Sequence, residues 1–310
     1  MQRRSMLTAR RTDVVLLMVA LVWGSSYLSA KTATTALPVL AVLLARYAIS
    51  ALACGALSGL RRRRWTRDEV RSGAVLGVTQ AAVLLLETYG VAHTSAANAG
   101  LIISLTIVLT PLLDRRRLPP AFFLAAGLCV LAVGLLTSSS GFHAPRLGDA
   151  LMLAAAVVRA GHVALVGRLT VGRPIDPLHL TTVQTVVGTA LLLPLAIPHL
   201  PALAAGSATT WSQLLYLALF CSVFAFLAQT WAIQRTSASR ASLLLGTEPI
   251  WAVAIGISLG GEHLTVWASL GAVLMIAGTY WGQAIERTHR EQSPTSGPTE
   301  PRARPACATT

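Results

Sequence analysis

The sequence predicts an all-α transmembrane protein with ten spanning helices, arranged as two inverted five-helix repeats with both termini in the cytoplasm. Three observations predict this fold class. Of the 310 residues, 54% are hydrophobic and only 12% are charged, which leaves too little polar surface for a soluble domain. Arginines gather in alternate loops between apolar segments. One sequence pattern occurs twice, once in each half of the chain.

Ten apolar segments are long enough to cross the hydrocarbon core, which takes about 20 helical residues. Their predicted ranges are 13–32, 36–60, 71–92, 95–113, 120–139, 147–168, 177–197, 211–234, 238–259 and 264–285. The first lacks a signal-peptide cleavage pattern, so we expect it to be retained as a helix. The chain then divides into a basic N-terminus (1–12), two five-helix repeats (13–142 and 147–285) and a tail rich in Pro, Ser and Thr (286–310) that we expect to be disordered.

Positive charge separates the predicted loops into two sets. One set, which includes both termini, carries 21 arginines, whereas the alternate loops carry only Lys31 and Arg146. Because positive loops stay in the cytoplasm, this split predicts a multi-pass protein of the cell membrane with both termini inside. The net charge of +13 follows from that topology. We expect no nucleic-acid binding, since the arginines flank apolar segments and form no patch with interleaved aromatic residues.

Cysteine and histidine spacing predicts neither a metal site nor a disulfide. Cys54, Cys129 and Cys221 lie within apolar segments, where packing explains them. The chain has no paired Cys or Cys/His spacing of the zinc-binding kind. It also has no GxxxxGK[ST] phosphate-binding loop and no HExxH motif, so we predict no cofactor and no enzymatic activity.

The repeated pattern links the two halves. Residues 88–101 (TYGVAHTSAANAGL) return as residues 230–243 (TWAIQRTSASRASL), each with a Thr-Ser-Ala run five positions after an aromatic residue. At an offset of 136, Asp13 also matches Asp149. Since each repeat holds an odd number of helices, the two copies must insert with opposite topology. Inverted repeats are a common architecture of secondary transporters, which bind their substrate near the midplane between the halves.

Ionisable side chains inside predicted spans are costly and need a partner or a function. Arg46, Glu87, Arg159 and Glu248 are such residues, and His162 follows Arg159 by one helical turn. The charges could simply neutralise one another. Alternatively, the arginines could hold a substrate carboxylate or phosphate. Glu87, Glu248 and His162 are then candidates for proton coupling, because a carboxylate kept from water and an imidazole can both titrate near neutral pH.

Aromatic and amide side chains complete the predicted cavity. Trp23 and Tyr27 share one face of the first helix, and Trp251 follows Glu248 by three positions. Aromatic rings in a cavity could hold an amphipathic or cationic molecule, although packing between helices would also explain them. The polar amides that we place in the same cavity are Gln80, Gln184 and Gln229.

Several short motifs, in their order and spacing, resemble the drug/metabolite transporter superfamily, specifically its EamA-like ten-helix transporters. They lie within residues 13–285 and comprise Trp23-Gly24-Ser25-Ser26, Arg46, Thr94-Ser95-Ala96, Glu248-Pro249, Gly260-Gly261-Glu262 and Gly271 with Gly278. The resemblance implies a secondary-active exporter of small, amino-acid-like or drug-like metabolites, working by alternating access without an ATP-binding domain.

Two other functions are also compatible with the sequence. A passive channel or facilitator could use the same scaffold without coupling, and an intramembrane enzyme could use the Glu and His residues within the spans. The expected partners are a small-molecule substrate and the lipid bilayer. The sequence is compatible with a monomer and with a homodimer.

Overall fold

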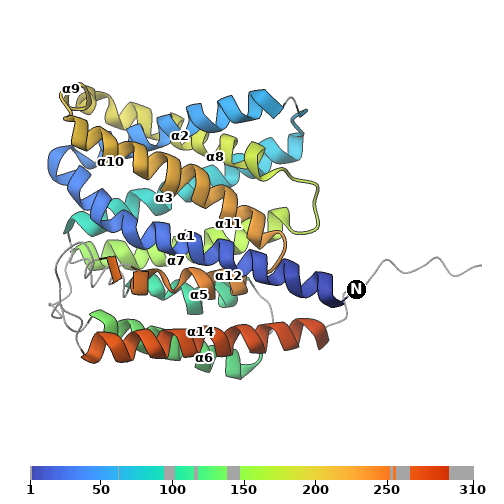
Figure 1. Cartoon of the computed structure of the whole chain (residues 1–310). Helices are drawn as coiled ribbons and strands as arrows, with labels where there is room; N and C mark the ends of the chain where they lie inside the picture. Colours follow the sequence, from blue (N-terminus) through green and yellow to red (C-terminus); the bar gives the residue numbers. More distant parts are fainter. Residues whose placement is uncertain are drawn as a thin grey trace, which may run out of the picture.

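The computed structural model describes residues 2–61, 63–93, 102–114, 118–137, 147–251, 254–255 and 266–292. Within these residues all regular secondary structure is helical, and the long helices run roughly along one common axis (Figure 1). The all-α fold class predicted from composition is therefore confirmed for the described part of the chain.

The helices follow one another in two successive groups. The first half contains α1 (Gln2–Ala36), α2 (Val39–Arg61), α3 (Arg67–His93), α5 (Thr106–Leu113) and α6 (Pro120–Thr137). The second half contains α7 (Leu147–Thr170), α8 (Pro177–Ala196), η2 (Ile197–His199), α9 (Leu200–Ala204), α10 (Ala208–Ala218), η3 (Leu219–Phe224), α11 (Ala225–Ile233), α12 (Ala238–Leu245) and α14 (Val266–Gln292). The π-helical turn η3 joins α10 and α11 into one long rod.

Six helices in the described residues are long and apolar enough to cross a membrane. Their ranges are Arg10–Ala36, Val39–Arg61, Arg67–His93, Leu147–Thr170, Pro177–Ala204 and Ala208–Ile233. Two shorter apolar helices, Ile102–Leu113 and Pro120–Ala132, accompany them. Parts of the predicted segments 95–113 and 238–259 lie outside the described residues. The prediction of many spanning helices is confirmed in this coarser form, whereas the count of ten stays a prediction.

Both ends of the described chain are more helical than the sequence suggested. α1 already begins at Gln2, within the predicted basic N-terminus, and α14 runs on to Gln292, past the predicted start of the tail at residue 286. Residues 293–310 lie outside the described part of the chain.

Polar caps explain where several helices begin. Thr66 and Glu69 form a capping box at the start of α3. The backbone N–H of Thr66 donates to the Glu69 carboxylate at 3.0 Å, and the backbone N–H of Glu69 donates to the Thr66 hydroxyl at 3.2 Å. Asp176 caps α8 by accepting from the backbone N–H of Leu178 at 2.8 Å. Ser237 caps α12 by accepting from the N–H of Arg240 at 3.1 Å. Each cap satisfies a backbone donor that the helix itself leaves free.

Contacts between helices follow the predicted repeat. α2 packs against α8 and α6 packs against α14, and each pair joins equivalent members of the two repeats. α3 packs on α7, just as its counterpart, the α10–α11 rod, packs on α1. In both cases the third helix of one repeat packs on the first helix of the other. A twofold relation between two similar halves produces this arrangement, so the packing fits the two repeats.

Glycines allow some of these helices to approach closely. A Cβ on Gly77 of α3 would lie 2.9 Å from the Cβ of Val187 and 3.1 Å from the backbone Cα of Gln184, both in α8. A Cβ on Gly188 of α8 would collide with the ring of Tyr47 in α2. Small residues at such crossings are typical of helix packing in membranes.

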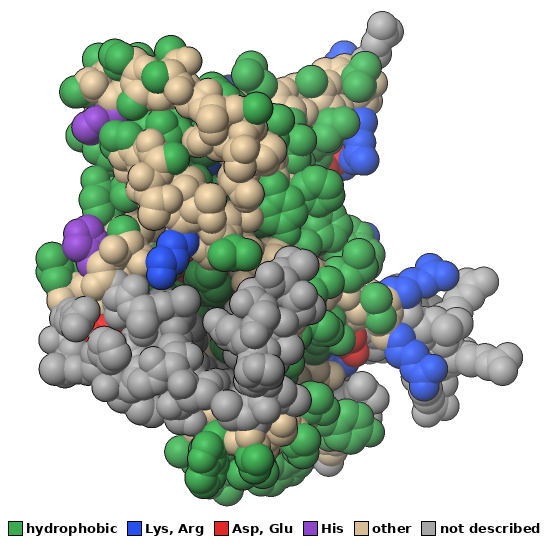
Figure 2. Space-filling view, turned by 60° about the vertical axis from the view of Figure 1, so that its left-hand side comes forward, with side chains coloured by type: hydrophobic (Ala, Val, Ile, Leu, Met, Phe, Trp, Pro, Cys, Tyr) green, Lys and Arg blue, Asp and Glu red, His purple; other side chains and the backbone are tan. Residues whose placement is uncertain are grey.

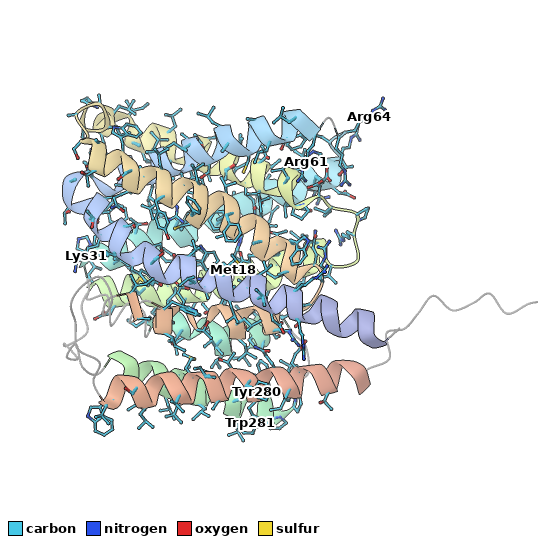
Figure 3. The ribbon with its side chains drawn as sticks, in the orientation of Figure 1. Met18, Lys31, Arg61, Arg64, Tyr280 and Trp281 are labelled. Carbon is cyan, nitrogen blue, oxygen red and sulfur yellow. The ribbon has the colours of Figure 1, made fainter. Side chains whose placement is uncertain are left out.

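The surface is apolar along the sides of the bundle and charged at its ends. Hydrophobic side chains cover much of the face seen in Figure 2, and large ones such as Leu52 and Leu131 are 75% and 68% exposed. Figure 3 places Lys31 at one end of the bundle, Arg61 and Arg64 at the other, and Met18 between them. We call the end that carries Arg61 and Arg64 the arginine-rich end. This distribution fits an apolar belt that faces lipid.

Two ion-pair networks lie at the arginine-rich end. In the first, Arg63 binds Asp176 at 3.0 Å, and the buried Glu69 carboxylate pairs with Nδ1 of His179 at 2.9 Å while Trp65 stacks on that imidazole. This network joins the α2–α3 connection to the α7–α8 connection.

The second network joins the start of α1 to the end of α14 through α12. Arg240 donates to both carboxylate oxygens of Asp13, at 2.9 and 2.7 Å, and its Nη1 lies 3.8 Å from Glu286. Glu286 also accepts from the hydroxyl of Ser237 at 2.7 Å. The start of α1 and the end of α14 therefore lie at the same end of the bundle.

Candidate functional site

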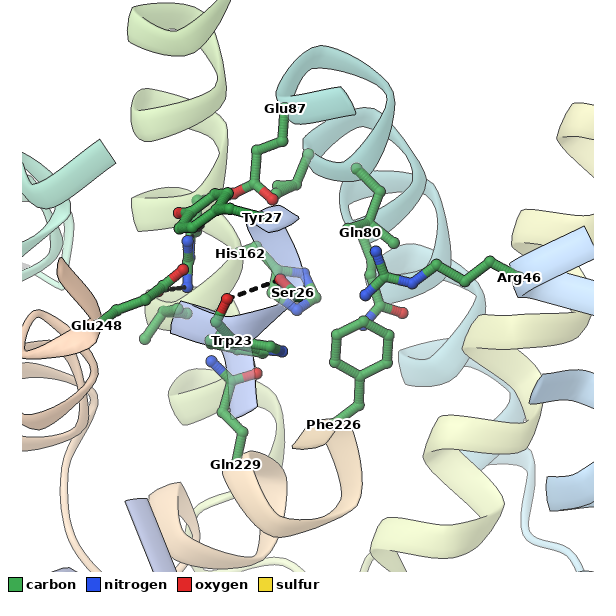
Figure 4. Close-up of a pocket in the computed structure, with 14 residues that line it drawn as sticks. Trp23, Ser26, Tyr27, Arg46, Gln80, Glu87, His162, Phe226, Gln229 and Glu248 are labelled. Atoms are coloured by element: carbon green, nitrogen blue, oxygen red, sulfur yellow. Dashed lines mark hydrogen bonds and ion pairs between the residues drawn. The ribbon is translucent and has the colours of Figure 1, made fainter. Parts of the chain in front are cut away.

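A polar cavity lies inside the bundle, between α1, α2, α3, α7, α11 and the short helical stretch that begins at Glu248, after α12 (Figure 4). Its volume open to water-sized molecules is about 50 Å³. The residues that line it are Trp23, Ser26, Tyr27, Arg46, Gln80, Val83, Leu84, Glu87, Arg159, His162, Val163, Phe226, Gln229 and Glu248. Helices from both halves of the chain thus supply its wall.

One guanidinium and two carboxylates form a charged triad in this cavity. Nη1 of Arg159 in α7 donates to Glu87 of α3 at 3.2 Å, and Nη2 donates to Glu248 at 2.9 Å. The side chains of Arg159, Glu87 and Glu248 are 11%, 17% and 5% exposed. Both terminal nitrogens of Arg159 are therefore paired with protein carboxylates.

An aromatic wall adjoins the triad. The guanidinium carbon of Arg159 lies 4.6 Å from the centroid of the Trp23 ring, which is cation–π geometry. The indole N–H of Trp23 donates to the backbone carbonyl of Cys221 at 3.0 Å, which fixes the orientation of the ring. Phe226 meets the same ring edge to face, with centroids 6.3 Å apart. Tyr27 lies one turn after Trp23, and its side chain also points into the cavity (Figure 4).

Arg46 is the second cation of the cavity, and its partners are uncharged. Its Nε donates to the hydroxyl of Ser222 at 2.6 Å, and its Nη2 donates to the carbonyl of Cys221 at 3.1 Å. Within the described residues it forms no ion pair with a carboxylate. Gln80 lines the cavity as well, and its carbonyl oxygen is buried without a hydrogen-bond partner among the residues described.

His162 and Gln229 complete the polar lining. Nδ1 of His162 lies 2.8 Å from the hydroxyl of Thr79, so these two groups share one hydrogen bond. Gln229 reaches the cavity from α11, opposite the side chains of α3 (Figure 4). No group of three or more His, Cys, Asp or Glu side chains suited to a metal ion occurs in the ranges that the structure describes.

Nine of the eleven side chains that the sequence singled out line this one cavity: Trp23, Tyr27, Arg46, Gln80, Glu87, Arg159, His162, Gln229 and Glu248. Gln184 and Trp251 do not. Gln184 is buried where α8 crosses close to Gly77 of α3, and Trp251 lines a separate apolar pocket beside α1 and α14.

The structure adds lining residues that the polarity argument did not select, notably Ser26 and Phe226. The repeat could have found them. At the offset of 136 that relates Asp13 to Asp149, Ser26 is the equivalent of His162, and at the offset of 142 Phe226 is the equivalent of Leu84.

The same offsets relate other lining residues. Trp23 is the equivalent of Arg159, and Glu87 is the equivalent of Gln229. Trp23 and Arg159 contact each other, which places this contact beside the axis that relates the two repeats. The cavity is therefore built from equivalent positions of both repeats that have diverged in chemistry.

Comparison with known proteins identifies the family. The sequence profile of the EamA-like transporter family matches the chain twice, at residues 10–139 and 146–281. The chain belongs to the EamA-like transporter family. Its resemblance to the drug/metabolite transporter superfamily is thus confirmed, and this EamA-like transporter is a multi-pass membrane protein.

Individual relatives agree with the family. Two uncharacterized transporters of Archaeoglobus fulgidus are similar to this EamA-like transporter. One is 27% identical over 268 residues, which cover 85% of this chain and 83% of the relative. The other is 24% identical over 273 residues, which cover 86% and 96%. These names point to a transporter rather than an enzyme.

A solved crystal structure of a protein shares the fold, with a TM-score of 0.72 over 88% of this chain and 98% of that chain. Its sequence identity is 16%, so the likeness concerns the fold alone.

Proposed function

We propose that this EamA-like transporter is a secondary-active exporter that carries small metabolites across the cell membrane by alternating access. In this proposal, residues 13–142 and 147–285 form two five-helix repeats of opposite orientation, and both termini lie in the cytoplasm. The observation that carries the proposal is the central cavity, whose wall combines equivalent positions from both repeats. A site between two inverted halves can face each side of the membrane in turn when the halves rock against each other.

Charge distribution supports the proposed orientation. The predicted cytoplasmic segments hold 21 arginines and the opposite loops hold two basic residues. In the structure, Lys31 and the pair Arg61 and Arg64 lie at opposite ends of the bundle (Figure 3). Excess positive charge marks the cytoplasmic side, so we assign the arginine-rich end to the cytoplasm.

Proton coupling would depend on the charged triad. Two carboxylates and one guanidinium leave one negative charge, and a single bound proton makes the triad neutral. We assign that proton to Glu87, which is more exposed than Glu248 and makes the longer bond to Arg159. Glu248 then acts as the constant partner of Arg159. His162 is a third candidate, although Thr79 already occupies its Nδ1.

Transport in proteoliposomes tests these assignments. The substrate is first identified by comparing metabolites in the medium and extracts of cells with and without the protein. We expect purified transporter to exchange this substrate and to accumulate it when a pH gradient is imposed. Glu87→Gln should retain exchange but lose the response to the gradient, because its side chain can no longer exchange a proton. Glu248→Gln should lower exchange about tenfold or more, because Arg159 loses its closer partner.

Asp68→Asn is the matched control, since Asp68 is exposed at the start of α3 and lies outside the cavity. Accumulation that ignores the gradient in the wild type would contradict proton coupling. A gradient response that persists in Glu87→Gln would contradict the role of Glu87 alone. Flux that does not saturate, with no counterflow, would indicate a channel instead of a transporter.

A further inference from the structure

Arg46 is held rigidly at the edge of the cavity by neutral groups. It lies in the first half of α2 and is 8% exposed. Its two bonds go to the Ser222 hydroxyl and the Cys221 carbonyl, at 2.6 and 3.1 Å. Neither acceptor carries a charge, so these bonds fix the guanidinium without neutralising it.

The π-helical turn η3 explains why a backbone carbonyl is free to hold Arg46. In a π-helix the hydrogen bonds reach five residues along the chain, so regular α-helical pairing is interrupted there. The hydroxyl of Ser222 donates to the carbonyl of Leu217 across this turn at 3.1 Å. The Cys221 carbonyl accepts from both Trp23 and Arg46. Such π-helical turns are frequent at functional sites.

Arg46 keeps unused donors. A guanidinium has five N–H groups, and the two bonds to Ser222 and Cys221 use one on Nε and one on Nη2. Nη1 has no hydrogen-bond partner in the described part of the chain. Two neighbouring nitrogens with free N–H groups match the spacing of carboxylate oxygens.

The two cations of the cavity therefore differ in kind. Arg159 forms ion pairs with two carboxylates, whereas Arg46 forms none among the described residues and only shares the cavity with Glu87. A buried cation whose hydrogen bonds go to neutral groups is costly, and in a membrane protein it usually marks a site that meets a charged ligand. Trp23 and Phe226 lie beside it and offer an aromatic surface to an apolar body.

We propose that Arg46 is the anion-binding residue of the cavity and that the transported molecule is a small carboxylic acid, whose carboxylate pairs with the free side of the guanidinium. This inference rests on the proposed transport function, because it names the substrate class of the same cavity. Gln80 lies next to this position and selects acids that carry a hydrogen-bond donor, since its carbonyl oxygen lacks a partner. Arg159, being neutralised, takes no substrate anion.

Matched ligands test the charge requirement on the full-length transporter in detergent. Each set has one aliphatic or aromatic body carrying a carboxylate, a primary amide, an amine or a phosphate ester. Binding is measured as a saturable rise of the thermal unfolding temperature. We expect acids to bind and the amides and amines with the same bodies to show no saturable effect. Binding by amines or amides, binding by phosphate esters without acids, or the absence of any acid response would each overturn the proposal.

Variants assign the response to Arg46. Arg46→Gln should weaken acid binding about tenfold to a hundredfold, the loss expected for hydrogen bonds to a charged group. Arg46→Lys keeps the positive charge but lacks the two neighbouring nitrogens of a guanidinium. It should therefore bind acids more weakly than the wild type and more tightly than Arg46→Gln. If Arg46→Gln fails to fold, Arg46→Lys and Ser222→Ala carry the test, and both must weaken acid binding. Unchanged affinity in these variants would overturn the assignment.

Binding and transport can fail separately. Acids that bind through Arg46 but do not exchange in proteoliposomes would contradict the transport proposal and leave the anion site intact. Exchange of a cation or a neutral solute, with no acid binding, would contradict the anion site and leave the transport proposal intact.

Discussion

At the scale of single residues, the cavity shows how a membrane protein balances buried charge. Arg159 contacts two carboxylates through its two terminal nitrogens, and its guanidinium lies over the face of Trp23. Removing one partner from a buried ion pair costs more than the pair contributes, because the remaining charge is left without compensation. In this triad, loss of the central Arg159 would leave two carboxylates without a partner, which is more uncompensated charge than the loss of either carboxylate would leave.

We therefore expect Arg159→Gln to destabilise the protein more than either carboxylate substitution. Two facing carboxylates would be left in the cavity, and a loss of about 3–5 kcal/mol is typical of a broken buried pair. Thermal unfolding in detergent measures this effect. Adding Glu248→Gln to Arg159→Gln should restore part of the stability, because one stranded charge is removed.

Arg64→Gln is the matched control, since Arg64 is exposed at the end of the bundle. We expect it to change stability by no more than about 0.5 kcal/mol. An unfolding temperature of Arg159→Gln equal to that of the control would show that the triad does not stabilise the fold.

The sequence could predict most members of the cavity because burying charge in lipid is costly. That rule selects Arg46, Glu87, Arg159 and Glu248 without any structure. It cannot select Phe226, which looks like any other apolar membrane residue. It also cannot separate the faces of one helix, so it does not reveal that Gln184 packs between α3 and α8 and not in the cavity.

At the scale of helices, close crossings connect the two halves. Gly188 of α8 lies against the ring of Tyr47 in α2, and Tyr47 is 1% exposed. A tyrosine ring is rigid, so it cannot bend away from an added methyl group as a long side chain would. The distance between α2 and α8 thus depends on the absence of a side chain at this position.

Gly188→Ala should therefore destabilise the bundle although alanine is the better helix former. Overpacking of this kind costs about 1–3 kcal/mol. Gly55→Ala is the matched control, because a Cβ on Gly55 of α2 would meet nothing within 4 Å. Unfolding temperatures of the two variants are compared in the same detergent. Equal temperatures would mean that α2 and α8 move apart at no cost.

Helix ranges followed from the apolar pattern where strong caps or breakers end it, as at Asp176 and Ser237. The π-helical turn at Leu219–Phe224 gave no such signal, because its six residues are ordinary for a membrane helix. Its consequence for Arg46 depends on contacts with α2, which are distant in sequence and cannot be deduced from a single segment.

At the scale of the whole molecule, charge asymmetry gives the bundle a direction. Hydropathy alone predicts helices but not which end faces the cytoplasm. Arginine placement adds this information, because positive loops resist transfer across the membrane. The structure gathers Arg61, Arg64 and both ion-pair networks at one end.

Cysteine labelling in cells tests the direction. Lys31→Cys and Arg64→Cys place a thiol at opposite ends, and both positions are exposed. In a Cys307→Ser background, the described native cysteines are buried and should stay unlabelled. We expect an impermeant maleimide to label Lys31→Cys in intact cells and Arg64→Cys only after permeabilisation. The opposite pattern would reverse the proposed topology.

Alternating access makes the ion pairs at the arginine-rich end part of the mechanism. Arg240 joins Asp13 of α1 to Glu286 of α14, so it must release one or both when the halves separate on that side. Arg240→Gln leaves two carboxylates close together and removes the attraction. We therefore expect the population to shift toward the state that opens at the arginine-rich end.

A thiol in the cavity reports this shift. Ser26→Cys changes one atom of a residue that lines the cavity, and an impermeant reagent is added to inside-out vesicles, in which the cytoplasmic side faces the reagent. We expect Arg240→Gln to speed its labelling several-fold. Arg235→Gln, which removes an exposed arginine from the same connection, should not, because Arg235 pairs with Trp231 at that surface and forms no ion pair within the described residues. Equal labelling rates in the two variants would show that the Asp13–Arg240–Glu286 network does not hold this end closed.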